Sequence, residues 1–72
     1  MRRFDAAALY EAVNKQRLDR GMTWDAVSKQ IGVATATIKR AQAGGRMEVD
    51  GMIALVDWLG VPVETFIRQA PR

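Results

Sequence analysis

The side chains with the clearest chemical capability lie in residues 34–43, a stretch of alanine, threonine and adjacent cations. If this stretch is a helix, side chains at its start and one turn later can face the base edges of DNA from the major groove. An arginine there can donate two hydrogen bonds to O6 and N7 of guanine, worth about 1–3 kcal/mol of discrimination. We therefore expect DNA-base contacts from Thr35, Ala36, Lys39 and Arg40.

Each of these four side chains suits a different contact. Arg40 is the best candidate for recognising a guanine. Thr35 can hydrogen-bond to a base or a phosphate, whereas Ala36 offers only an apolar contact with a thymine methyl group. Lys39 can reach a base or a phosphate. The alternative is a solvated basic surface, which is the ordinary role of adjacent cations on a helix.

Contacts with phosphate position a protein on DNA without specifying the sequence. Free N–H groups and the dipole at a helix N-terminus attract phosphate, which makes the start of the preceding helix a candidate. Trp24 has an alternative role as a side chain that packs this helix start. We expect phosphate contacts from Thr23, Trp24, Thr37 and Arg46.

Positive charge is concentrated around the same stretch. Between Ala26 and Met47 there are four basic and no acidic residues, a charge of +4, whereas the rest has seven basic and eight acidic residues, a charge of −1, giving the net +3. This excess favours an anionic partner. Arg2 and Arg3 are candidates for an arm that follows the DNA backbone or enters the minor groove, with a solvated tail as the alternative.

Two short helices joined by a tight turn are predicted to position these side chains. Thr23 is a suitable N-cap for the first of them, and Gly32 tolerates the left-handed backbone that the turn needs. Ser28 is small enough for the helices to cross, and its hydroxyl is expected to bond to the carbonyl of Trp24. The expected apolar anchors are Val27, Ile31, Val33, Ile38 and Ala41.

Three further helices are predicted around this pair, at about 5–20, 49–59 and 63–69. Phe66 and Ile67 are expected to point inward from the last of them. Because no stretch alternates apolar and polar residues, no strand is predicted. The sequence predicts an all-α fold of five short helices in a single domain, 1–72, with 1–4 as a flexible arm and 70–72 as a frayed tail.

Composition excludes several classes of protein. The 72 residues include no cysteine and no histidine, which excludes disulfides and the usual zinc sites. With one serine and no phosphate-binding glycine loop, an enzyme is not expected, and neither is a cofactor or metal. No apolar run approaches the roughly 20 residues that span a bilayer, so we expect a cytoplasmic chain without a membrane partner.

The chain resembles the phage-repressor and Cro (Xre-type) helix-turn-helix family over about residues 6–68. Thr23 to Val33 is similar to the family's Thr-Gln-x-x-Leu-Ala-x-x-Leu-Gly-Val, and Thr37-Ile38-Lys39-Arg40 is similar to its Thr-Ile-Ser-Arg. Gly44 matches the glycine after the recognition helix, and Leu59-Gly60-Val61 with Phe66 is similar to the closing Leu-Gly-Val…Leu. Trp24 and Gln42 depart from the family's Gln and Glu, so the family's Arg–Glu pair becomes an expected Arg17–Gln42 hydrogen bond.

The resemblance implies a compact five-helix bundle of the lambda-repressor-like type, with the helix-turn-helix formed by helices 2 and 3. It also implies a homodimer on a palindromic DNA operator, in a bacterial nucleoid-associated or phage-encoded protein. The leading hypothesis is a small transcriptional regulator, a repressor, with its dimer contact near Trp58 and Phe66. The alternative is a protein-interaction module on the same fold, antitoxin-like or a partner in a phage or mobile element, favoured by the alanines of residues 34–43.

Overall fold

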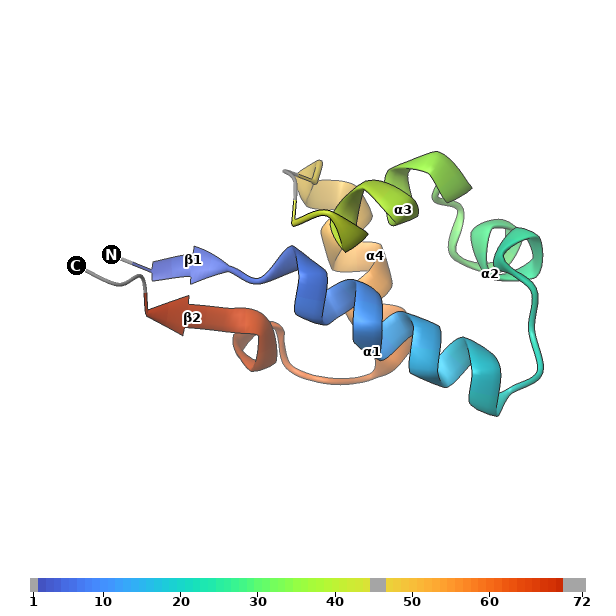
Figure 1. Ribbon diagram of the computed structural model, residues 1–72, viewed down its shortest axis with the longest axis horizontal. Helices are drawn as coiled ribbons and strands as arrows, with labels where there is room; N and C mark the ends of the chain where they lie inside the picture. The colour runs from blue at the N-terminus through green and yellow to red at the C-terminus, as the bar shows by residue number, and fades with distance from the viewer. Residues whose placement is uncertain (1, 45–46, 70–72) are drawn as a thin grey trace.

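Four α-helices, a 3-10 helix and a two-stranded antiparallel sheet make up the computed structural model, which describes residues 2–44 and 47–69 (Figure 1). The helices pack around α1, and the sheet formed by β1 and β2 extends beyond the N-terminal end of α1 (Figure 1). In chain order the elements are β1 (Arg2–Phe4), α1 (Ala6–Asp19), α2 (Trp24–Ile31), α3 (Thr35–Gln42), α4 (Val49–Leu59), η1 (Val63–Phe66) and β2 (Ile67–Gln69).

The first four predicted helices are confirmed, α2 begins at its predicted capping residue Thr23, and Asp5 caps α1 in the same way. Asp5 Oδ1 accepts a hydrogen bond from the Ala8 amide at 2.9 Å, and Thr23 Oγ1 accepts one from the Ala26 amide at 3.1 Å. Such bonds satisfy amide groups that have no partner within the first helical turn. The starts of α1 and α2 are therefore fixed by local sequence.

The prediction of a five-helix, all-α bundle is wrong. Residues 63–66 form one 3-10 turn, and the chain then continues as β2, which pairs with β1 in the register Arg2↔Gln69, Arg3↔Arg68 and Phe4↔Ile67. The Asp5 amide donates to the Phe66 carbonyl at 2.7 Å, and the Phe4 and Phe66 rings lie 6.0 Å apart. Three-residue strands are too short to show alternation, and their partners lie at opposite ends of the chain, so no local pattern indicates them.

The pairing of β1 with β2 also places the residues of the predicted N-terminal arm. The proposed arm residues Arg2 and Arg3 lie in a strand with exposed side chains. The predicted frayed tail, 70–72, lies outside the described residues.

The hydrophobic core contains at least one side chain from each of the four α-helices and from η1. Phe66 is buried as predicted, whereas Ile67 is only half-buried. Ile38 and Ala41 are fully buried, so α3 is held through one face against α1. The core cluster consists of Leu9, Val13, Val27, Ile38, Leu55, Val56 and Phe66.

Replacing two of the glycines with alanine should change the stability of the chain in opposite directions. Gly32 has φ +82°, where a Cβ meets nothing within 4 Å but strains the backbone. Gly51 lies in α4, where a Cβ would make ordinary 3.8 Å contacts with Thr37 and Val33. We expect Gly32→Ala to lower the free energy of unfolding by about 1–2 kcal/mol and Gly51→Ala to raise it by about 0.5–1 kcal/mol. Urea denaturation measures both, and equal shifts of the same sign would contradict the assigned backbone conformations.

Within residues 2–44 and 47–69, no helix combines the length and apolar character needed to cross a bilayer.

Candidate nucleic-acid interface

The turn between α2 and α3 is fixed by two short hydrogen bonds. Gly32 adopts the left-handed conformation, and its amide donates to the Ser28 carbonyl at 2.8 Å. The Ser28 hydroxyl donates to the Val33 carbonyl at 2.6 Å, and not to the Trp24 carbonyl as predicted from the sequence. The hydroxyl therefore joins α2 to the residue that leads into α3, which fixes the angle between the two helices. Ser28 can make this bond and still serve as the predicted small residue where α2 and α3 cross.

The outward face of α3 consists of two cations and two alanines. Ala36, Lys39, Arg40 and Ala43 follow the i, i+3, i+4, i+7 spacing of a single helix face, and all four are exposed. The opposite face carries the fully buried Ile38 and Ala41. The structure thus brings three of the four predicted base-contacting residues onto one accessible surface; we call the four residues 36, 39, 40 and 43 the α3 face.

The two threonines of α3 lie at the edges of this face. Thr35 is half-buried and lies one turn before Lys39, so it adjoins the α3 face. Thr37 is half-buried on the other edge, where its Cγ2 lies 3.8 Å from the position of a Cβ added to Gly51 on α4. The predicted base contact of Thr35 keeps its position beside the cations, whereas the methyl group of Thr37 faces α4.

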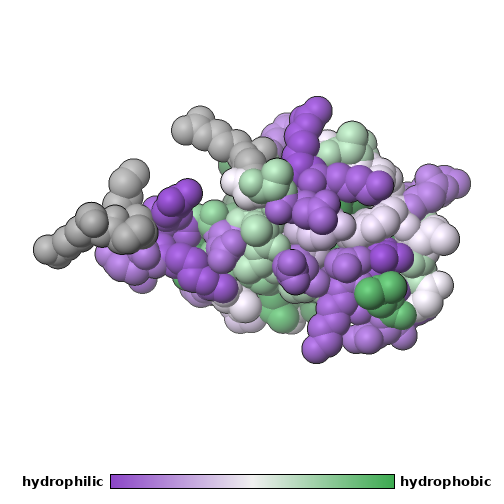
Figure 2. All heavy atoms as spheres, viewed as in Figure 1, coloured by the Kyte–Doolittle hydropathy of each residue, from purple (hydrophilic) through white to green (hydrophobic). Residues whose placement is uncertain are grey.

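The charges of the α3 face are not neutralised within the described residues. Lys39 and Arg40 are exposed and form no ion pair with any described residue. Lys29 on α2 does pair with Asp25, at 3.1 Å, but both side chains are more than three-quarters exposed, so this pair contributes little. Figure 2 shows hydrophilic side chains projecting on the side of the molecule where α3 lies. This surface therefore presents positive charge to solvent.

Trp24 has a packing role that explains its position at the start of α2. Its ring stacks on Tyr10 at a centroid distance of 5.2 Å and an interplanar angle of 20°, and the Arg17 guanidinium lies 4.7 Å over it. Arg17 also donates to Asn14 Oδ1 and to the Met22 carbonyl. The expected Arg17–Gln42 hydrogen bond does not form. No local sequence pattern indicates this cluster, because Tyr10 and Trp24 come together only when α1 packs beside α2.

Truncating Trp24 should therefore affect stability. We expect Trp24→Ala to lower the free energy of unfolding by about 1–3 kcal/mol, because it removes a stacked ring and a cation–π contact from a half-buried site. Thermal or urea denaturation monitored by circular dichroism measures the change. Tyr10→Ala in the same assay is the matched variant, since it removes the other ring. If neither variant changed stability, the stacked pair would have no structural role.

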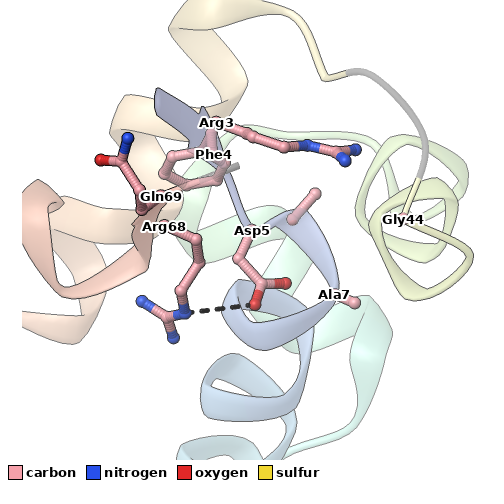
Figure 3. A pocket seen from close by; sticks show the side chains of 8 residues that line it. Arg3, Phe4, Asp5, Ala7, Gly44, Arg68 and Gln69 are labelled. Atoms are coloured by element: carbon pink, nitrogen blue, oxygen red, sulfur yellow. Dashed lines mark ion pairs between the residues drawn. The ribbon is translucent and has the colours of Figure 1, made fainter. Parts of the chain in front are cut away.

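Arg3 reaches toward the C-terminal end of α3 (Figure 3). It lines an open pocket of about 270 Å³ between the sheet, the start of α1 and Gly44. Arg68, which faces Arg3 across the strands, turns instead to Asp5, with Nε 3.5 Å from Oδ2 (Figure 3). The sheet therefore places the Arg3 cation beside the end of the helix that carries the α3 face.

Two further residues that the sequence singles out, Thr23 and Trp58, form hydrogen bonds within the chain. Thr23 is exposed, and its hydroxyl oxygen caps α2. Arg46, predicted to contact phosphate, lies outside the described residues. Trp58, expected near a dimer contact, donates from its indole to Gln30 Oε1 at 3.0 Å, and the Arg20 guanidinium lies 4.9 Å over its ring.

Within residues 2–44 and 47–69, no three histidine, cysteine, aspartate or glutamate side chains lie close enough together to hold a metal ion.

Comparison of the chain with protein-family models, curated proteins and solved structures returned no match. What the chain binds is therefore inferred from the geometry and charge of the α3 face.

Proposed function

We propose that this chain binds double-stranded DNA in a sequence-specific way, with α3 in the major groove. The observation that carries the proposal is the α3 face, which is exposed, cationic and rigidly backed by the buried Ile38 and Ala41. An α-helix with its side chains is about 10–12 Å in diameter, and the major groove is about 12 Å wide. The alanines at positions 36 and 43 allow the helix backbone to approach the bases closely.

The side chains divide into those that specify sequence and those that position the protein. Arg40 recognises a guanine, Lys39 and Thr35 contact bases or adjacent phosphates, and Ala36 meets a thymine methyl group. Phosphates are contacted by Thr23, Thr37 and Arg46 and by the indole N–H of Trp24. Arg3, held beside the end of α3 by the sheet, adds a further phosphate contact, and Arg2, exposed on β1, is a further candidate for a phosphate contact.

A single α3 contacts only a few base pairs, so a selective site needs two copies. We propose a homodimer whose two α3 helices enter successive major grooves of a palindromic operator, about 34–36 Å apart. In this arrangement the chain is a small transcriptional regulator, a repressor, in the cytoplasm of a bacterium or encoded by a phage.

Selection of bound duplexes from a random pool, followed by a salt titration of the selected duplex, tests the proposal. Each phosphate that a lysine or arginine neutralises contributes a slope of about −0.9 in log affinity against log salt concentration. Phosphate contacts by the three cations Arg3, Lys39 and Arg46 of one protomer predict a slope of about −3 for each half-site. Lys39→Ala should make this slope shallower by about 0.9, whereas Lys15→Ala, on the exposed surface of α1, is the matched control and should leave it unchanged. Failure to enrich any sequence, or a slope near zero, would contradict the proposal.

A protein-interaction module on the same fold is the second candidate. Exposed Ala36 and Ala43 give the α3 face a smooth surface that another protein can pack against. This candidate predicts a tight protein complex that is lost when Ala36 is replaced with a bulky residue, together with no shift of any duplex at low salt. Duplex binding that Ala36→Glu abolishes would favour DNA as the ligand.

A further inference from the structure

A second surface of the chain carries the opposite charge to α3. Residues 47–67 contain four acidic residues and no basic residue, a charge of −4, whereas residues 26–46 contain four basic and no acidic residues, a charge of +4. All four acidic side chains, Glu48, Asp50, Asp57 and Glu64, are exposed. The charges of opposite sign are therefore strongly separated along the sequence, although the net charge is only +3.

The exposed face of α4 combines this charge with a row of apolar side chains. Val49, Ile53 and Asp57 follow one another at four-residue spacing, and Asp50 lies beside them on the helix surface. Val49 is 61% exposed and Ile53 is 54% exposed. The helix uses its other face, with Leu55 and Val56, to pack against α1 and α2. We call Val49, Asp50, Ile53 and Asp57 the α4 strip.

Isolated exposed apolar residues are normal on protein surfaces, so the arrangement matters more than the exposure. Leu18 is also 61% exposed, but it lies between Arg17 and Asp19 and has no apolar neighbour one turn away on its exposed side. In the α4 strip, two branched side chains are adjacent, and the charges beside them have one sign. This pattern is complementary to a helix that presents its own apolar pair flanked by cations.

The negative charge of this face of α4 also argues against two other partners, a second copy of the chain and an anionic membrane. In a two-fold dimer through this face, Asp50 and Asp57 of one copy would approach the same carboxylates of the other, which is repulsive. An anionic lipid surface would be repelled for the same reason. A cationic partner satisfies both the apolar pair and the carboxylates.

We propose that the α4 strip docks a cationic amphipathic helix of another protein. Aliphatic side chains at i and i+4 of that helix cover Val49 and Ile53, while lysine or arginine side chains at its edges approach Asp50 and Asp57. The docking itself does not depend on the proposed DNA binding, because no residue of the strip belongs to the α3 face.

Titration of the full ¹⁵N-labelled chain with a designed helical peptide tests this proposal. The probe carries leucines at i and i+4 and lysines on both flanks, and its control has glutamates in place of the lysines. The lysine peptide should shift the amides of residues 49–57 and saturate with a Kd of about 100 µM or tighter. The glutamate peptide should leave these amides unshifted, because its charges are repelled by Asp50 and Asp57.

Three variants distinguish specific binding at the α4 strip from non-specific hydrophobic binding. Val49→Ser with Ile53→Ser should weaken the binding about tenfold, and Asp50→Asn with Asp57→Asn should weaken it and remove its salt dependence. Leu18→Ser is the matched control, equally exposed at 61%, and should leave the Kd unchanged. The ¹⁵N spectrum of each variant reports whether the fold is intact. The proposal is overturned if shifts fall outside the strip, if binding does not saturate, if Leu18→Ser weakens it equally, or if the free chain dimerises through residues 49–57.

Discussion

Replacing Arg40 with alanine should erase the preference for guanine at one position of each half-site. The guanidinium is exposed on the α3 face and forms no ion pair with any described residue, so its hydrogen-bonding groups are available to a base. Loss of a two-point contact with guanine costs about 1–3 kcal/mol of discrimination, or roughly 5- to 150-fold in relative affinity. Competition binding with duplexes substituted at each position measures the preference.

Two companion variants define what Arg40 contributes. Arg40→Lys keeps the charge but lacks the planar fork, so it should retain affinity for random DNA and still lose much of the base preference. Lys39→Ala should weaken the binding of preferred and random duplexes by similar factors if it contacts phosphate. If Arg40→Ala kept the full preference at every position, the assignment of Arg40 to a base would be wrong.

The four α-helices could be predicted because their signals are local. Asp5 and Thr23 accept amide hydrogen bonds within the next three residues, and apolar residues at helical spacing identify the buried faces. The same spacing predicts which side chains of α3 remain outside, since burial of Ile38 and Ala41 leaves positions 36, 39, 40 and 43 exposed. The candidate site is therefore largely a consequence of helix periodicity.

The sheet and the aromatic cluster could not be predicted in this way. Pairing of β1 with β2 joins residues at the two ends of the chain, and each strand is only three residues long. The stacking of Trp24 on Tyr10 depends on how α2 packs beside α1. Both features arise from tertiary packing, which overrides the local preference of residues 63–69 for a helix.

The placement of Arg3 beside Gly44 follows from the sheet as well. A flexible N-terminal arm and a paired strand have the same sequence signal, namely two arginines at the start of the chain. Only the register Arg3↔Arg68 fixes where the cation lies. The charge of the α4 strip is visible in the sequence, but its exposure beside Val49 and Ile53 requires knowing which face of α4 is buried.

Replacing Ile38 with alanine should destabilise the chain more than any surface substitution described above. Ile38 is fully buried in α3 and belongs to the core cluster, and truncation of such a side chain costs about 2–5 kcal/mol through lost transfer energy and the cavity that remains. At about 0.05–0.15 kcal/mol per residue, a domain of this size has a total stability of only about 4–11 kcal/mol. Urea denaturation followed by circular dichroism should therefore show a large fall in the midpoint, or no folded baseline at 25 °C.

The conservative variant connects this loss to the α3 face. Ile38→Val should cost only about 0.5–1.5 kcal/mol and should preserve DNA affinity, because the helix stays anchored with residues 36, 39, 40 and 43 outward. DNA added to Ile38→Ala should raise its midpoint in proportion to the logarithm of duplex concentration, since a ligand that binds only the folded state stabilises it. A folded Ile38→Ala variant with unchanged stability would mean that α3 is not held by the core, and the rigid presentation of Lys39 and Arg40 would lose its physical basis.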